Sequence, residues 1–105
     1  EERRGAKPEK SGDSGLRKAD RKAAAELRAQ LAPLRKAAQA AEKALADLHR
    51  QQAELETRLA DPSLYQGPPA RLTELRRQQG DLARKVEAAE LVWLEAAETL
   101  EKAQG

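Results

Sequence analysis

The side chains best suited to binding chemistry in this 105-residue sequence are basic and lie close together near its start. Between Gly15 and Lys36, seven cations face only Asp20 and Glu26, so the stretch carries +5 whereas the whole chain carries +2. In a helix, like charges four residues apart repel, and phosphates of a nucleic acid would relieve that repulsion and release counterions. The alternative is a solvated, partly disordered approach to the rest of the chain. The predicted nucleic-acid-binding residues are Arg17, Lys18, Arg21, Lys22, Arg28, Arg35 and Lys36.

A second basic group surrounds the Pro- and Gly-containing segment 61–69. It predicts a secondary surface that contacts RNA or a ribosomal protein. In the alternative interpretation, Leu64 and Tyr65 close the end of a hydrophobic seam. The members of this secondary tip surface are Arg58, Tyr65, Arg71, Arg76 and Arg77.

The sequence lacks the residues that catalysis or metal binding would need. His49 is the single histidine, cysteine is absent, and neither a second imidazole nor a thiolate is available to share a metal. The carboxylates are spread over charged stretches with no pocket to raise a pKa, and no glycine-rich phosphate loop is present. We therefore predict no catalytic residue and no metal site.

The elements that position these residues are two heptad runs of apolar side chains, with steps alternating between three and four residues. The first run is Leu27, Leu31, Leu34, Ala38, Ala41, Leu45, Leu48, Gln52, Leu55 and Leu59. The second run is Leu72, Leu75, Gln79, Leu82, Val86, Ala89, Trp93, Ala96, Leu100 and Ala103. The segment between them is short, so the sequence predicts an all-α fold, an antiparallel two-helix coiled-coil hairpin.

In an antiparallel hairpin, the numbers of two residues that face each other across the seam add up to a constant, here about 131, and this constant defines the register. Gln52 then meets Gln79, so the two polar seam positions share one layer, and Trp93 meets the small Ala38. Such self-complementarity predicts a monomeric hairpin in which the glutamine layer fixes the register.

Boundaries follow from helix-breaking residues. Residues 1–15 hold several Gly, Ser and Pro and are predicted to be a flexible linker, followed by one coiled-coil domain over 16–105. We expect the first helix at about 20–60, with Asp20 as its N-cap and a kink or short break near Pro33.

The turn is expected at 61–69, because Pro62 disfavours helical geometry at the residue before it. The second helix is expected at about 70–103, with Gly80 weakening its interior.

Composition limits the protein class. Phe, Met and Cys are absent, and Tyr65 and Trp93 are the only aromatic residues, which is too little for a compact globular core. No apolar stretch approaches the length of a membrane span, and the lack of Cys fits a cytoplasmic protein. Because the sequence begins at Glu1 without a Met, we expect a fragment of a longer protein.

Three segments resemble the C-terminal coiled-coil domain of bacterial ABC-F ATPases, in the Uup/YheS branch. They are Pro33–Lys36 at the entry to the long helix, Leu59–Tyr65 at the turn, and, near the end, Val92–Ala96 with its Trp-Leu-Glu followed by Glu98–Glu101. The resemblance covers roughly residues 20–103. The turn and the Trp-Leu-Glu are specific in combination, whereas the heptads alone are not.

The resemblance implies a parent with two ATP-binding cassettes, which would bind ATP and Mg²⁺ outside this sequence, and no membrane span. It also implies action on the ribosome in translation, or DNA binding, with the basic stretch 17–36 as the expected contact for DNA or ribosomal RNA. Two alternatives stay open: the tRNA-binding arm of an aminoacyl-tRNA synthetase, and a purely structural protein–protein interaction hairpin.

Overall fold

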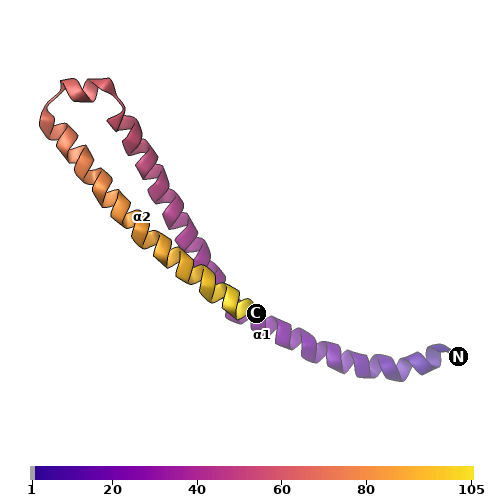
Figure 1. The fold of residues 1–105 in the computed structure, drawn as a ribbon. Coiled ribbons are helices and arrows are strands. Elements are labelled where there is room, and N and C mark those ends of the chain that lie inside the picture. Colours follow the sequence, from indigo (N-terminus) through magenta and orange to yellow (C-terminus); the bar gives the residue numbers. More distant parts are fainter. Residues whose placement is uncertain (1) are drawn as a thin grey trace. The chain divides into compact units, whose positions relative to one another are not determined.

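A computed structural model describes residues 2–105, with side chains from Gly15 onward. It contains α1 (Glu2–Leu59), the short 3₁₀ helix η1 (Pro62–Gln66) and α2 (Pro69–Gln104). In Figure 1, α2 runs back alongside the second half of α1 after the turn at η1. The antiparallel all-α hairpin predicted from the heptads is confirmed. Two compact units make up the chain, Glu1–Pro33 and Leu34–Gly105, and the hairpin belongs to the second.

The predicted seam matches the pattern of burial over most of the hairpin. On α2 two positions depart from it: Trp93, predicted to lie in the seam against Ala38, is 38% exposed, and Ala103 is exposed as well. From Leu34 to Leu59, every predicted seam position is buried or partly buried, and nearly all positions between them are exposed. Burial is strongest near the turn, where Leu55, Leu59 and Leu64 form a cluster against which Leu72, Leu75 and Leu82 pack. These leucines supply the apolar area that holds the two helices together.

The glutamine layer is found where the register predicted it. Gln52 and Gln79 line one cavity of about 210 Å³ between the helices, beside Leu55. The side-chain amide oxygen of Gln79 accepts a hydrogen bond from Arg76 of the same helix at 3.2 Å. Contact of Gln79 and Gln52 with the same cavity agrees with a partner sum near 131.

Helix α1 differs from the sequence-based prediction at two places. Asp20 was predicted to cap its start, but residues 16–19 are already helical, so Asp20 lies in the helix interior. The prediction was wrong because the Leu-, Arg-, Lys- and Ala-rich sequence around it has high helix propensity and needs no start there. A short break at 29–33 is also wrong, since the helix continues through Pro33.

Pro33 nevertheless coincides with a boundary, since the first compact unit ends at Pro33 and the second begins at Leu34. Proline removes one backbone amide from the helical ladder, which weakens a helix locally. A kink at this residue stays a prediction. The flexible linker predicted over residues 1–15 also stays a prediction, because the structure describes side chains only from Gly15 onward.

The turn holds the feature that the sequence did not predict. Helix α1 ends at Leu59, one residue before the predicted end, and α2 begins at Pro69. Between them Pro62–Gln66 forms a 3₁₀ helix, capped at its start by the Asp61 side chain. Proline suits a first helical position because its missing amide would be unbonded there in any case.

Candidate nucleic-acid interface

The predicted basic residues fall on both sides of the unit boundary, so each group is described by itself. Arg17, Lys18, Arg21, Lys22 and Arg28 lie in the helical part of the first unit, and all are exposed. Arg17 and Arg21 are one helical turn apart, as are Lys18 and Lys22, so the predicted like-charge pairs exist.

Arg35 and Lys36 belong to the second unit, near the start of its share of α1, and they too are exposed. The four ion pairs found among residues 15–105 involve none of the seven predicted cations. Asp20 and Glu26, the two carboxylates within the stretch, take part in none of these pairs either. The whole basic stretch is therefore uncompensated at contact distance and open to solvent.

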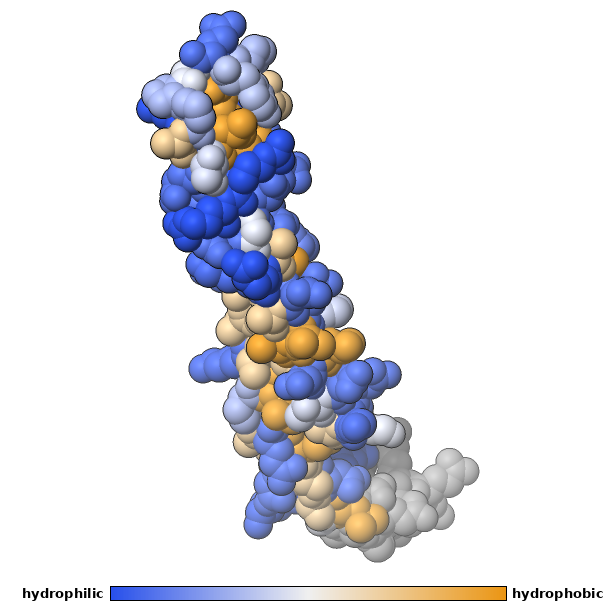
Figure 2. Space-filling model, turned by 60° about the vertical axis from the view of Figure 1, so that its left-hand side comes forward, coloured by the Kyte–Doolittle hydropathy of each residue, from blue (hydrophilic) through white to orange (hydrophobic). Residues whose placement is uncertain are grey.

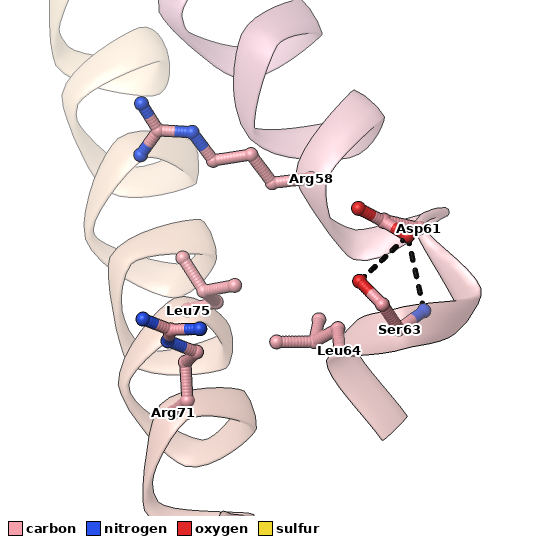
Figure 3. Close-up of a pocket in the computed structure, with 6 residues that line it drawn as sticks. All are labelled: Arg58, Asp61, Ser63, Leu64, Arg71 and Leu75. Carbon is pink, nitrogen blue, oxygen red and sulfur yellow. Dashed lines mark hydrogen bonds between the residues drawn. The ribbon is translucent and has the colours of Figure 1, made fainter. Parts of the chain in front are cut away.

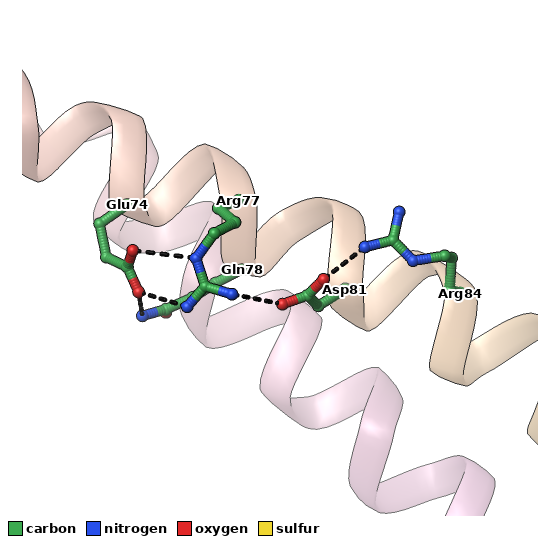
Figure 4. A network of polar contacts seen from close by, with 5 residues as sticks. All are labelled: Glu74, Arg77, Gln78, Asp81 and Arg84. Atoms are coloured by element: carbon green, nitrogen blue, oxygen red, sulfur yellow. Dashed lines mark hydrogen bonds and ion pairs between the residues drawn. The ribbon is translucent and has the colours of Figure 1, made fainter.

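In the secondary tip surface, some arginines form ion pairs or hydrogen bonds within the protein and others form no ion pair among residues 15–105. Arg77 forms ion pairs with Glu74 at 2.7 Å and with Asp81 at 2.9 Å, and Asp81 also pairs with Arg84 (Figure 4). Arg76 donates to Gln79. These two arginines thus have intrahelical partners, which the sequence spacing alone did not reveal. Arg58 and Arg71 lie beside a cavity at the turn and have no ion pair among residues 15–105.

The ion pairs on α2 shift two pKa values. Hydrogen bonds from Arg77 and then Gln78 lower the pKa of Glu74 to about 2, and the Glu74 carboxylate raises the pKa of Arg77 in return. Both groups are exposed to solvent, which screens their interaction. Arg77 is therefore already paired with carboxylates of its own helix, which makes it a poorer candidate for binding phosphate.

Tyr65 and Leu64 have different roles at the turn. Leu64 is buried against Leu55 and Leu59, so it closes the seam as one interpretation of the sequence expected. Tyr65 is 55% exposed, and its hydroxyl donates to the Leu59 carbonyl at 2.6 Å. Tyr65 therefore bonds the last carbonyl of α1 and does not fill the seam.

An apolar groove lies further along α2. Leu45 of α1 faces Ala88, Leu91, Trp93 and Leu94 of α2 across a hollow of about 710 Å³. Leu91 and Leu94 are 62% and 47% exposed. In Figure 2, apolar surface extends along the face in view and is bordered by hydrophilic side chains.

Within the described part of the chain, no group of three or more His, Cys, Asp or Glu side chains is placed to hold a metal. In that part, no helix is both long enough and apolar enough to cross a membrane.

The extended hairpin, its Asp-Pro turn and the basic entry can now be compared with known families. The model of the ABC transporter C-terminal domain matches residues 33–98. This chain belongs to that family. It is the coiled-coil arm of ABC-F proteins, and the matched residues are those of the C-terminal domain of an ABC ATPase. Searches of the curated proteins and of the solved structures found no match.

The matched region of this ABC transporter C-terminal domain begins at Pro33 and includes the whole turn and most of α2. Arg35 and Lys36 lie inside it, whereas Arg17, Lys18, Arg21, Lys22 and Arg28 precede it. Most of the predicted basic residues thus lie in the segment that precedes the matched family domain.

Proposed function

We propose that this domain is a non-catalytic, nucleic-acid-binding arm of an ABC-F ATPase of the Uup/YheS branch, acting on ribosomal RNA or on DNA in the cytoplasm. The observation that carries the proposal is the stretch of exposed cations without ion pairs over residues 17–36. Elsewhere in the described chain, Arg50, Arg77 and Arg84 have carboxylate partners. Uncompensated charge that the protein itself does not neutralise favours a polyanionic partner.

The composition of the stretch indicates the mode of contact. Its apolar residues are aliphatic and it has no aromatic side chain, so bases have no stacking platform there. Contact through the phosphate backbone, without base readout, is the mode that a helix bearing Arg and Lys supports. Affinity would then depend steeply on salt and weakly on nucleotide sequence.

The test reverses the charge of Arg17, Lys18, Arg21 and Lys22 to Glu. Each lost phosphate contact should reduce the slope of log affinity against log salt by about 0.9 for duplex DNA, so the slope should flatten by about 3–4. A control with the same change in charge replaces four exposed cations elsewhere, Lys43, Arg50, Lys85 and Lys102. Fluorescence anisotropy with DNA and RNA duplexes of one sequence would compare the two. Equal affinity and slope for both variants would remove the proposed site.

A second candidate function is a protein–protein interaction hairpin. The observation that favours it is the exposed run Leu91, Val92, Trp93 and Leu94 beside the apolar groove, since exposed contiguous apolar surface often marks a docking site. It predicts concentration-dependent self-association or a partner protein, and no salt-sensitive duplex binding. Family membership argues against the aminoacyl-tRNA synthetase alternative.

A further inference from the structure

A notch at the turn of the hairpin brings together basic side chains from two helices. It has a volume of about 300 Å³ and is lined by Arg58, Asp61, Ser63, Leu64, Arg71 and Leu75. Figure 3 shows Arg58 on α1 and Arg71 on α2, with Leu75 between their guanidinium groups in this view and Leu64 beside them on η1. This volume lies at the small end of ligand pockets, which suits a small charged group with a short apolar neighbour.

The lining of this notch carries two positive charges, on Arg58 and Arg71, and one negative charge, on Asp61. Arg58 and Arg71 are exposed and belong to none of the ion pairs among residues 15–105. The one carboxylate in the lining, Asp61, accepts hydrogen bonds from the Ser63 amide at 3.0 Å and from the Ser63 hydroxyl at 2.9 Å. Asp61 is therefore hydrogen-bonded to η1, and among residues 15–105 neither guanidinium group forms an ion pair.

The backbone around the notch is held in place by contacts within the protein, so a ligand would not have to order it. The Tyr65 hydroxyl bonds the end of α1 to η1, and Leu64 is buried between Leu55 and Leu59. Arg58 and Arg71 thus project from backbones fixed relative to each other within the second unit. Two guanidinium groups on a preorganised frame bind a tetrahedral oxyanion better than two free ones, because less ordering is needed.

We propose that this notch is a phosphate-binding site in which Arg58 and Arg71 clamp one backbone phosphate of a nucleic acid. Guanidinium forks match the oxygens of a phosphate, and the leucine floor can contact the adjoining sugar. The notch forms a second contact separate from the basic stretch 17–36. This inference rests on the proposed function and narrows the predicted tip surface to two of its arginines.

The test replaces both arginines, Arg58→Gln with Arg71→Gln, and compares them with the charge-matched control Arg50→Gln with Arg84→Gln. All four side chains are exposed, so both variants should fold, which circular dichroism would check. Binding of DNA and RNA duplexes is measured by anisotropy over a series of salt concentrations. The tip variant should bind about tenfold more weakly than the control, with a salt slope reduced by about 1, as one lost phosphate contact requires.

The outcomes separate this inference from the proposed function. If the fourfold charge reversal at residues 17–22 weakens duplex binding while the tip variant equals its control, the phosphate notch is wrong and the proposed function stands. If the wild-type chain binds no duplex at low salt, both are wrong. A polyglutamate probe completes the design: if the tip variant loses polyglutamate binding and keeps duplex binding, the notch serves an acidic protein partner and the phosphate assignment is overturned.

Discussion

Replacing Tyr65 by Phe removes one hydroxyl and should weaken the hairpin measurably. In a helix continuing past Leu59, the Ser63 amide would bond the Leu59 carbonyl. That amide instead donates to the Asp61 carboxylate, and the Tyr65 hydroxyl takes its place at the Leu59 carbonyl at 2.6 Å. One phenolic oxygen therefore satisfies the carbonyl that the turn leaves without an amide.

The expected loss follows from that single bond. An intramolecular hydrogen bond contributes about 0.5–1.5 kcal/mol net. Tyr65 is 55% exposed, so water can reach the freed carbonyl and the loss should lie in the lower part, about 0.5–1 kcal/mol. In a domain of this size that corresponds to a fall in Tm of about 2–8 °C.

The assay is urea unfolding followed by circular dichroism and by the fluorescence of Trp93, the only tryptophan in the chain. Thr57→Val is a matched control, because the Thr57 hydroxyl also donates to a carbonyl, that of Ala53, at 3.0 Å. Ala53 lies inside α1, where the helical ladder already supplies its carbonyl with an amide, so the control should change the free energy of unfolding by less than about 0.5 kcal/mol. Equal losses in the two variants would refute the capping role of Tyr65.

Three further outcomes are expected. Leu64→Ala should cost about 2–5 kcal/mol in the same urea assay, because it opens a cavity in the leucine cluster at the turn, and a loss below about 1 kcal/mol would contradict that packing. Gly80→Ala should stabilise by up to about 1 kcal/mol, since its new Cβ would meet only the flexible Arg84 side chain at 3.8 Å; destabilisation would show unrecognised crowding. The pKa values of Asp61 and Glu74 are lowered in the folded state, by hydrogen bonds from Ser63 and Arg77, and Glu74 falls from 4.5 to about 2. Their stabilising contribution is therefore complete above about pH 5 and lost as the pH falls towards 2, and Glu74→Gln should flatten the acid limb of a plot of urea midpoint against pH.

Sequence periodicity predicted the hairpin well because a seam depends on side-chain type at fixed intervals. The end of the first helix and the start of the second were predicted to within one residue, since Pro62 and Pro69 limit helical geometry locally. The glutamine layer was found for the same reason, because antiparallel pairing at constant register links each position to one partner.

Heptad spacing did not predict which cations form ion pairs with carboxylates. Arg77 and Arg71 are both basic residues near the turn, yet Arg77 has two carboxylates within one helical turn, whereas Arg71 forms no ion pair among residues 15–105. Which of several possible pairs forms depends on rotamers and on the face each side chain occupies. The 3₁₀ helix likewise depends on Asp61 competing with the backbone for the Ser63 amide, a choice that pattern counting does not resolve.

The sequence by itself determined a self-complementary two-helix arm with an uncompensated basic stretch, because heptad spacing and net charge are properties of the chain order alone. The tertiary structure decided the rest at the turn: Leu64 closes the seam, Tyr65 bonds the end of α1, and Arg58 and Arg71 line the same notch. Those roles depend on distances between residues on different elements, which exist only once the two helices have packed together.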